Sequence, residues 1–182
     1  MVRGETYRRR LHERALDQYG YVTAADAEEL GIPPIELRKL HQRGGLEHVA
    51  YGLYRFEDIP RTPRDQFMEA VLRVGPEAVL AGETVLALHN LALVNPRHIR
   101  VYTPRRIRRR LPPFLKVDDL VTTEPERTKY EGIPTTTVAR ALRDCKGHVM
   151  PERLLDATRE AALAGLVHKQ EADRLLGEFA AL

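Results

Sequence analysis

The sequence predicts an α+β fold made of two domains. Residues 21–56 show a strand, a short helix, a tight turn at Gly31–Pro33, a second helix and a glycine-containing hairpin. Residues 65–182 alternate amphipathic helical segments with short stretches of alternating apolar and polar residues, a pattern that indicates helices around a small sheet. The first order is typical of a winged helix-turn-helix, which places its second helix in a DNA major groove. We therefore expect a winged helix-turn-helix over 1–58, a linker over 59–64 and an α+β domain with a basic patch over 65–182.

The composition narrows the class of protein. The chain has 182 residues, 43% of them hydrophobic, and a formal net charge of only +3, so an attraction to nucleic acid has to come from the local distribution of charge. Its single cysteine excludes an internal disulfide framework and suits a reducing compartment. Residues 1–10 are charged and no apolar run approaches the roughly 20 residues of a membrane span. We expect a cytoplasmic protein with no signal peptide and no membrane partner.

The first two helices are indicated by spacing and capping residues. A helix is expected over Glu5–Tyr19, ended by Gly20. Its apolar face would consist of Leu11, Ala15, Leu16 and Tyr19. Thr23 is suited to cap the next helix, and Asp26, three residues later, can reach back in a variant of the capping box.

The second helix of the motif is expected over Pro34–Arg43, anchored by Leu37 and Leu40. The side chains predicted to point outward, into a major groove, are Glu36, Arg38, Lys39, Gln42 and Arg43. Arginine and lysine bond guanine or phosphate, and glutamine bonds adenine. A solvated amphipathic face is the alternative interpretation, and the flanking turn and hairpin favour a recognition helix.

The hairpin after this helix reads as a wing. Its apolar residues, expected to pack under the helices, are Leu46, Val49, Leu53 and Phe56. Gly52 permits the positive φ of a tight tip, and Tyr51 and Arg55 are predicted to contact DNA, with ordinary hairpin surface as the alternative. Residues 1–58 contain 9 Lys and Arg against 10 Asp and Glu. This domain is near neutral and would hold phosphate weakly by itself.

Charge is asymmetric in the second domain. Strands are expected at Ile99–Thr103, Leu115–Val121 and Lys129–Ile133, and helices at 65–74, 83–91, 136–145, 151–164 and 169–180. Residues 97–116 hold eight Lys or Arg and no acid. The arginines predicted to grip backbone phosphate are Arg105, Arg106, Arg108, Arg109 and Arg110. A solvated loop, and a contact with RNA or a toxin, are the alternatives.

Motifs of catalysis are missing from the sequence. It contains no GxxxxGK[ST] loop and no GxSxG elbow, and its seven histidines show no metal-ligand spacing. Cys145 lies on an apolar helical face, as a buried structural thiol does. Asp118 and Asp119 could be placed in a nuclease-like carboxylate cluster, but a surface loop is the favoured interpretation. We expect no enzymatic activity, no catalytic residue, no metal and no cofactor.

Five segments resemble a known family. In the first domain they are YVTAADAEELG at 21–31, RGGL at 43–46 and GLYR at 52–55; in the second they are AGETVLALHNL at 81–91 and GIPTTTVARALRD at 132–144. In this order they resemble the AbiEi antitoxin family of bacterial type IV toxin–antitoxin systems.

The resemblance implies a transcription regulator. Such a protein binds double-stranded DNA at inverted repeats of its own promoter, represses its operon and counteracts a nucleotidyltransferase-type toxin without a stable complex. The alternatives are a toxin- or RNA-binding interaction protein, an orphan winged-helix regulator and a degenerate nuclease-like enzyme.

Overall fold

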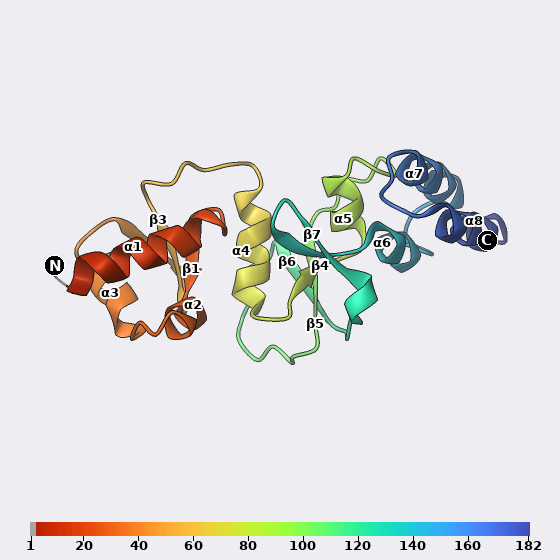
Figure 1. The fold of residues 1–182 in the computed structure, drawn as a ribbon. Coiled ribbons are helices and arrows are strands. Elements are labelled where there is room, and N and C mark those ends of the chain that lie inside the picture. Colours follow the sequence, from red (N-terminus) through yellow and green to blue (C-terminus); the bar gives the residue numbers. More distant parts are fainter. Residues whose placement is uncertain (1–2) are drawn as a thin grey trace. The chain divides into compact units, whose positions relative to one another are not determined.

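A computed structural model describes residues 3–182 and divides the chain into two compact units, Met1–Gly75 and Pro76–Leu182. The elements of the first unit are α1 (Arg3–Leu16), β1 (Tyr21–Thr23), α2 (Ala24–Glu29), α3 (Ile35–Gln42), β2 (Leu46–Ala50), β3 (Leu53–Phe56) and α4 (Asp65–Val74) (Figure 1). Its three strands form an antiparallel sheet in the order β1-β3-β2. The predicted order of strand, helix, turn, helix and hairpin is confirmed.

The core of the first unit joins the three N-terminal helices to the sheet. Its buried members are Leu11, Ala15, Val22, Ala27, Ile32, Leu37, Leu46 and Phe56. Two residues expected on the apolar face of α1 behave differently. Leu16 is exposed, since it ends the helix and points about 100° away from Ala15. Tyr19 lies beyond the helix with a φ of 56°.

The capping box between β1 and α2 is confirmed. The Thr23 hydroxyl oxygen accepts a hydrogen bond from the Asp26 backbone N–H at 3.0 Å, and Asp26 Oδ2 accepts one from the Thr23 N–H at 2.8 Å. Asp26 also accepts hydrogen bonds from Arg14 Nη1 and Gln18 Nε2 on the α1 side. One buried carboxylate therefore caps α2 and ties it to α1.

The division between the units differs from the expected one. Helix α4 was expected to open the second domain, but it groups with the first unit. The Tyr21 hydroxyl donates a hydrogen bond to Glu69 Oε2 at 2.9 Å, and Arg73 Nη2 donates one to the Val49 carbonyl at 3.0 Å. Residues 59–64 have the local composition of a linker, but these side-chain contacts from β1 and β2 hold the following helix against the winged helix.

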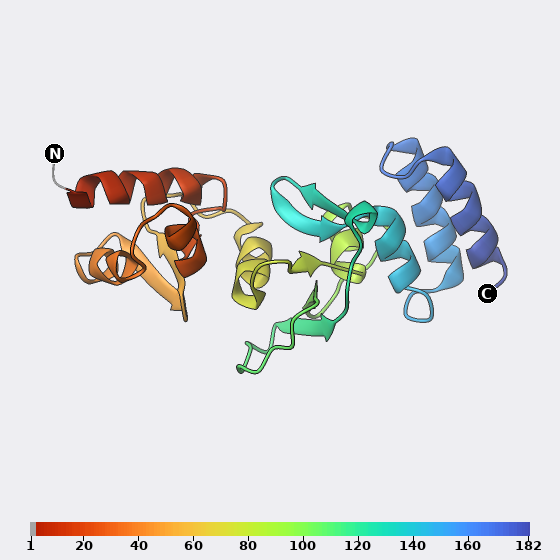
Figure 2. The same cartoon turned by 60° about the horizontal axis from the view of Figure 1, so that its bottom comes forward.

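The second unit is an α+β domain. Its elements are β4 (Val79–Leu80), α5 (Glu83–Leu88), β5 (Ile99–Thr103), β6 (Leu115–Asp119), the 3₁₀ turn η1 (Glu124–Glu126), β7 (Arg127–Tyr130), β8 (Ile133–Thr136), α6 (Val138–Asp144), α7 (Pro151–Leu163) and α8 (Lys169–Ala180). The sheet order is β6-β5-β4-β8-β7, with β5–β6 and β4–β8 parallel and the other pairs antiparallel. Helices α7 and α8 lie side by side, next to α6 (Figure 2). The predicted class, helices around a small sheet, is confirmed.

One predicted strand proves to be a hairpin. Lys129–Ile133 was expected to form a single strand, but Tyr130 ends β7 and Ile133 begins β8. Glu131 and Gly132 between them have φ values of 47° and 86°. A two-residue turn with both central φ values positive matches the right-handed twist of the flanking strands. The chain therefore reverses at Glu131–Gly132, where the sequence pattern suggested continuity.

Three further findings bear on function. Cys145, the C-cap residue of α6, is fully buried, as predicted. Among residues 3–182, no helix is long and apolar enough to cross a bilayer. Among the side chains that the structure describes, those of residues 7–182, no group of three or more His, Cys, Asp and Glu residues is arranged to hold a metal ion.

Candidate nucleic-acid interface

Helix α3 is held by its apolar side and by the turn before it. Leu37 is fully buried and Leu40 packs against the same core. In the turn, the Ile32 backbone N–H donates a hydrogen bond to the Ala27 carbonyl at 2.7 Å, and the Ile32 side chain is buried. The opposite face of α3 is therefore presented to solvent in a fixed orientation.

The polar face of α3 divides into paired and unpaired side chains. Lys39 Nζ donates a hydrogen bond to Glu36 Oε1 at 2.7 Å, so these two predicted residues partly satisfy each other. Arg38, Gln42 and Arg43 are exposed, and their side chains have no hydrogen-bond partner among the described residues. A guanidinium can bond a guanine edge bidentately and a carboxamide can bond adenine. These three residues can therefore read bases without first breaking an intramolecular bond.

Ile35 was missed by the sequence analysis. It stands at the first position of α3 and its side chain is 48% exposed. In helix-turn-helix proteins the N-terminal residues of the recognition helix contact base edges, and an apolar side chain there can contact the methyl group of thymine. Its position outside the Leu37 and Leu40 stripe is the sequence signal that could have found it.

A ring cluster links α3 to the wing. His41 Nδ1 lies 2.7 Å from the Leu46 carbonyl oxygen. The His41 ring centroid is 6.0 Å from that of His48 and 6.2 Å from that of Tyr54. These contacts join the C-terminal turn of α3 to β2 and β3.

The two residues predicted for the wing have opposite environments. Tyr51 is 96% exposed at the tip of the hairpin, next to Gly52 with its φ of 68°. Arg55 is only 2% exposed, and its prediction as a DNA contact is wrong. Its guanidinium pairs with Asp65 Oδ2 at 3.1 Å and donates hydrogen bonds to the carbonyls of Phe56 at 3.0 Å and Ile59 at 2.9 Å. Arg55 lies on the central strand of the sheet, and the segment that runs into α4 covers the face toward which it points.

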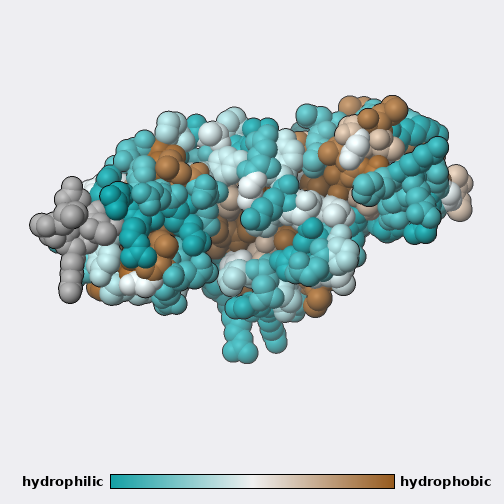
Figure 3. Space-filling view, in the orientation of Figure 1, coloured by the Kyte–Doolittle hydropathy of each residue, from teal (hydrophilic) through white to brown (hydrophobic). Residues whose placement is uncertain are grey.

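The basic loop lies between β5 and β6, and hydrophilic side chains project from this part of the second unit (Figure 3). All five predicted arginines on it are exposed. Arg105 bonds Glu77 through Nε at 3.1 Å and Nη2 at 2.7 Å. Arg106, Arg108 and Arg110 have no carboxylate partner among residues 7–182, whose side chains the structure describes. The run from 97 to 116 has no acid of its own, but tertiary contacts supply acids from outside it, among them Glu77 for Arg105, and Asp118 for Arg100 at 2.6 Å.

The comparisons with known proteins bear on the first unit. Residues 9–56 match the profile of a family described as "Transcriptional regulator, AbiEi antitoxin". The chain is similar to the crystal structure of the RV2827C protein from Mycobacterium tuberculosis, with a TM-score of 0.46, 18% identity, and coverage of 94% of this chain and 71% of that one. No curated protein matches. The matched segment runs from within α1 through α2, α3 and the wing, so the winged helix-turn-helix of the first unit is similar to that of AbiEi antitoxin transcriptional regulators.

Proposed function

We propose that the protein is the DNA-binding antitoxin of a type IV toxin–antitoxin system and acts in the cytoplasm. Two copies bind an inverted repeat in the promoter of their own operon and repress it. The protein also counteracts a nucleotidyltransferase-type toxin without forming a stable complex with it. The observation that carries the DNA-binding part is a packed helix α3 whose Arg38, Gln42 and Arg43 side chains face solvent unpaired, inside the segment that matches the family.

The two units divide the work in this proposal. Helix α3 reads base edges, with Tyr51 of the wing beside the sugar–phosphate backbone. Arg106, Arg108 and Arg110 neutralise phosphates, an interaction that is independent of sequence and weakens with salt. The near-neutral first unit makes such a contribution necessary, since base contacts alone give little affinity at physiological salt.

The decisive experiment is fluorescence-anisotropy binding to the duplex upstream of the gene and to a scrambled duplex, each at two salt concentrations. Arg38→Ala should remove about 1–3 kcal/mol of preference for the native duplex and leave the salt dependence nearly intact. Replacing Arg108, Arg109 and Arg110 by Gln should weaken binding to both duplexes alike. It should also reduce the slope of log affinity against log salt concentration by up to about 3. Arg153→Gln, an exposed arginine on α7, is the matched control and should change neither.

Two outcomes would contradict the proposal. Equal affinity of the wild-type protein for both duplexes would make the basic loop a general polyanion site and direct attention to RNA. Equal loss of specificity from the α3 and loop variants would refute the division of labour. The antitoxin part is tested by co-expression with the adjacent toxin gene, where growth should be restored without co-purification; a stable co-purifying partner would favour an interaction protein.

A further inference from the structure

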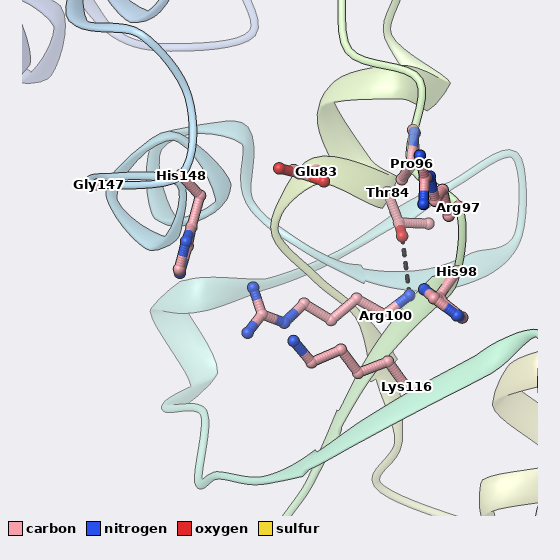
Figure 4. A pocket seen from close by; sticks show the side chains of 9 residues that line it. All are labelled: Glu83, Thr84, Pro96, Arg97, His98, Arg100, Lys116, Gly147 and His148. Carbon is pink, nitrogen blue, oxygen red and sulfur yellow. Dashed lines mark hydrogen bonds between the residues drawn. The ribbon is translucent and has the colours of Figure 1, made fainter.

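The second unit contains a recessed basic cavity separate from the loop arginines. It has a volume of about 410 Å³ and lies among β5, β6, the start of α5 and the loop after α6. Arg100 and Lys116 are register partners on the parallel strands β5 and β6. Figure 4 shows their side chains lying alongside each other, with the charged ends pointing toward the loop that carries His148. The basic segment 97–116 is therefore divided in the fold. Arg100 and Lys116 line the cavity, and the arginines at 105–110 lie on the exposed loop.

Hydrogen bonds fix the position of Arg100 and leave part of its guanidinium available to an anion. Its backbone N–H donates a hydrogen bond to the buried Thr84 hydroxyl at 2.8 Å, and its Nε donates one to Asp118 Oδ2 at 2.6 Å. Nη1 and Nη2 have no hydrogen-bond acceptor among the described residues. Burial works against the charge of this guanidinium, but the hydrogen bond and the charge of Asp118, together with Tyr102 and Cys145, outweigh burial and hold the pKa of Arg100 above its ordinary value. The side chain is 21% exposed, so two oriented donors face the cavity.

The other charged residues in the cavity wall indicate the chemical class of the ligand. Lys116 is exposed and has no carboxylate partner among residues 7–182, and His148 adds an imidazole from the opposite wall. Glu83 places one carboxylate above these cations (Figure 4). Cations suit a phosphate group, and a carboxylate suits a hydroxyl donor. The cavity volume falls within the roughly 300–1,000 Å³ of small-molecule sites.

We propose that this cavity binds a nucleoside phosphate, with the phosphate on Arg100 and Lys116 and a sugar hydroxyl on Glu83. The recess admits a terminal phosphate, whereas the internal phosphates of a duplex suit the exposed loop. The same chemistry has two sources, a free nucleotide or the 5′-phosphorylated end of a nucleic-acid strand. The proposal is independent of promoter binding.

The test uses isothermal titration calorimetry on the full chain with ATP, adenosine, and a single-stranded oligonucleotide with and without a 5′-phosphate. Lys116→Gln should lower the affinity for ATP or for the 5′-phosphorylated strand about tenfold or more, since a hydrogen bond to a charged group is lost. The matched control is Lys129→Gln, an exposed lysine on β7 at the other edge of the same sheet, which should leave binding unchanged. Arg108→Gln should lower duplex affinity and leave ATP binding unchanged, which separates this site from the promoter interface.

If Lys116→Gln weakens the binding of ATP selectively, the ligand is a free nucleotide. If it weakens the binding of the 5′-phosphorylated strand selectively, the ligand is a strand end. Absence of binding of every phosphorylated probe at millimolar concentration would overturn the proposal. Equal losses in Lys116→Gln and Lys129→Gln, or equal binding of ATP and adenosine, would do the same. Because Lys116 is exposed, its replacement tests the site without disturbing the Arg100–Asp118 pair.

Discussion

Replacing Arg55 by Ala should destabilise the first unit strongly. The change removes the partner of the Asp65 carboxylate, which is itself buried, and the donor to the carbonyls of Phe56 and Ile59. Breaking a buried ion pair from one side costs about 3–5 kcal/mol, since the remaining charge stays buried and unpaired. We expect a loss of about 4 kcal/mol in the free energy of unfolding of this unit.

The assay has to report on the two units separately, because a two-unit chain does not unfold in one step. Hydrogen exchange with mass spectrometry along a urea series does so. Peptides from residues 20–75 should open at much lower urea in Arg55→Ala, and peptides from 133–180 should not change. Arg61→Ala breaks the exposed pair with Glu47 and should cost under about 1 kcal/mol.

The double variant Arg55→Met, Asp65→Leu separates charge from packing. Removing both partners leaves no unpaired buried charge, so the two changes should couple by about 2 kcal/mol. The reasoning is refuted if Arg55→Ala costs no more than Arg61→Ala. It is also refuted if Arg55→Ala leaves stability unchanged and weakens DNA binding, since Arg55 would then be a wing contact after all.

Three further outcomes are expected. Thr23→Ala removes the cap of α2 and should cost the first unit about 1 kcal/mol in urea unfolding, and Thr23→Ser should recover most of it. Burial lowers the pKa of His89 below its ordinary value near 6.5, so the unfolded chain takes up the proton first. The second unit should therefore lose stability as the pH falls from about 7 through 6.5 toward the lower pKa of the folded state, and His89→Phe, which keeps a ring against Tyr130, should flatten this dependence. Burial, reinforced by the charges of Glu83 and Asp144, raises the pKa of the Cys145 thiol to about 12. Native protein at pH 8 should resist alkylation and urea-unfolded protein should react fully; rapid labelling of the native state would contradict the buried position.

Most of the helix-turn-helix could be predicted from the sequence because its signals are local. The Thr23 and Asp26 box, the glycine and prolines of the turn and the Leu37–Leu40 spacing act within a few residues of one another. The helix over Lys169–Ala180 follows the prediction for the same reason. The reversal at Glu131–Gly132 was missed, although Gly132, which tolerates the positive φ that the turn requires, was a local signal for it.

The environment of each charged or polar side chain was decided by contacts between residues that lie far apart in the chain. Arg55 and Tyr51 belong to one hairpin and both have side chains able to bind DNA. Only the segment that runs from Phe56 into α4 buries Arg55, while Tyr51 stays in solvent. The basic run reads as one patch along the chain, but parallel pairing of β5 and β6 moves Arg100 and Lys116 into a cavity and leaves 105–110 outside. Side-chain pairs such as Arg55–Asp65 and Arg105–Glu77 could not be predicted from the sequence, because the spacing of the two residues follows neither helix nor strand periodicity. The sequence by itself thus determined the elements and their order, and the tertiary structure decided which charges are free to bind a ligand, because burial and ion pairing depend on elements that meet only in the folded chain.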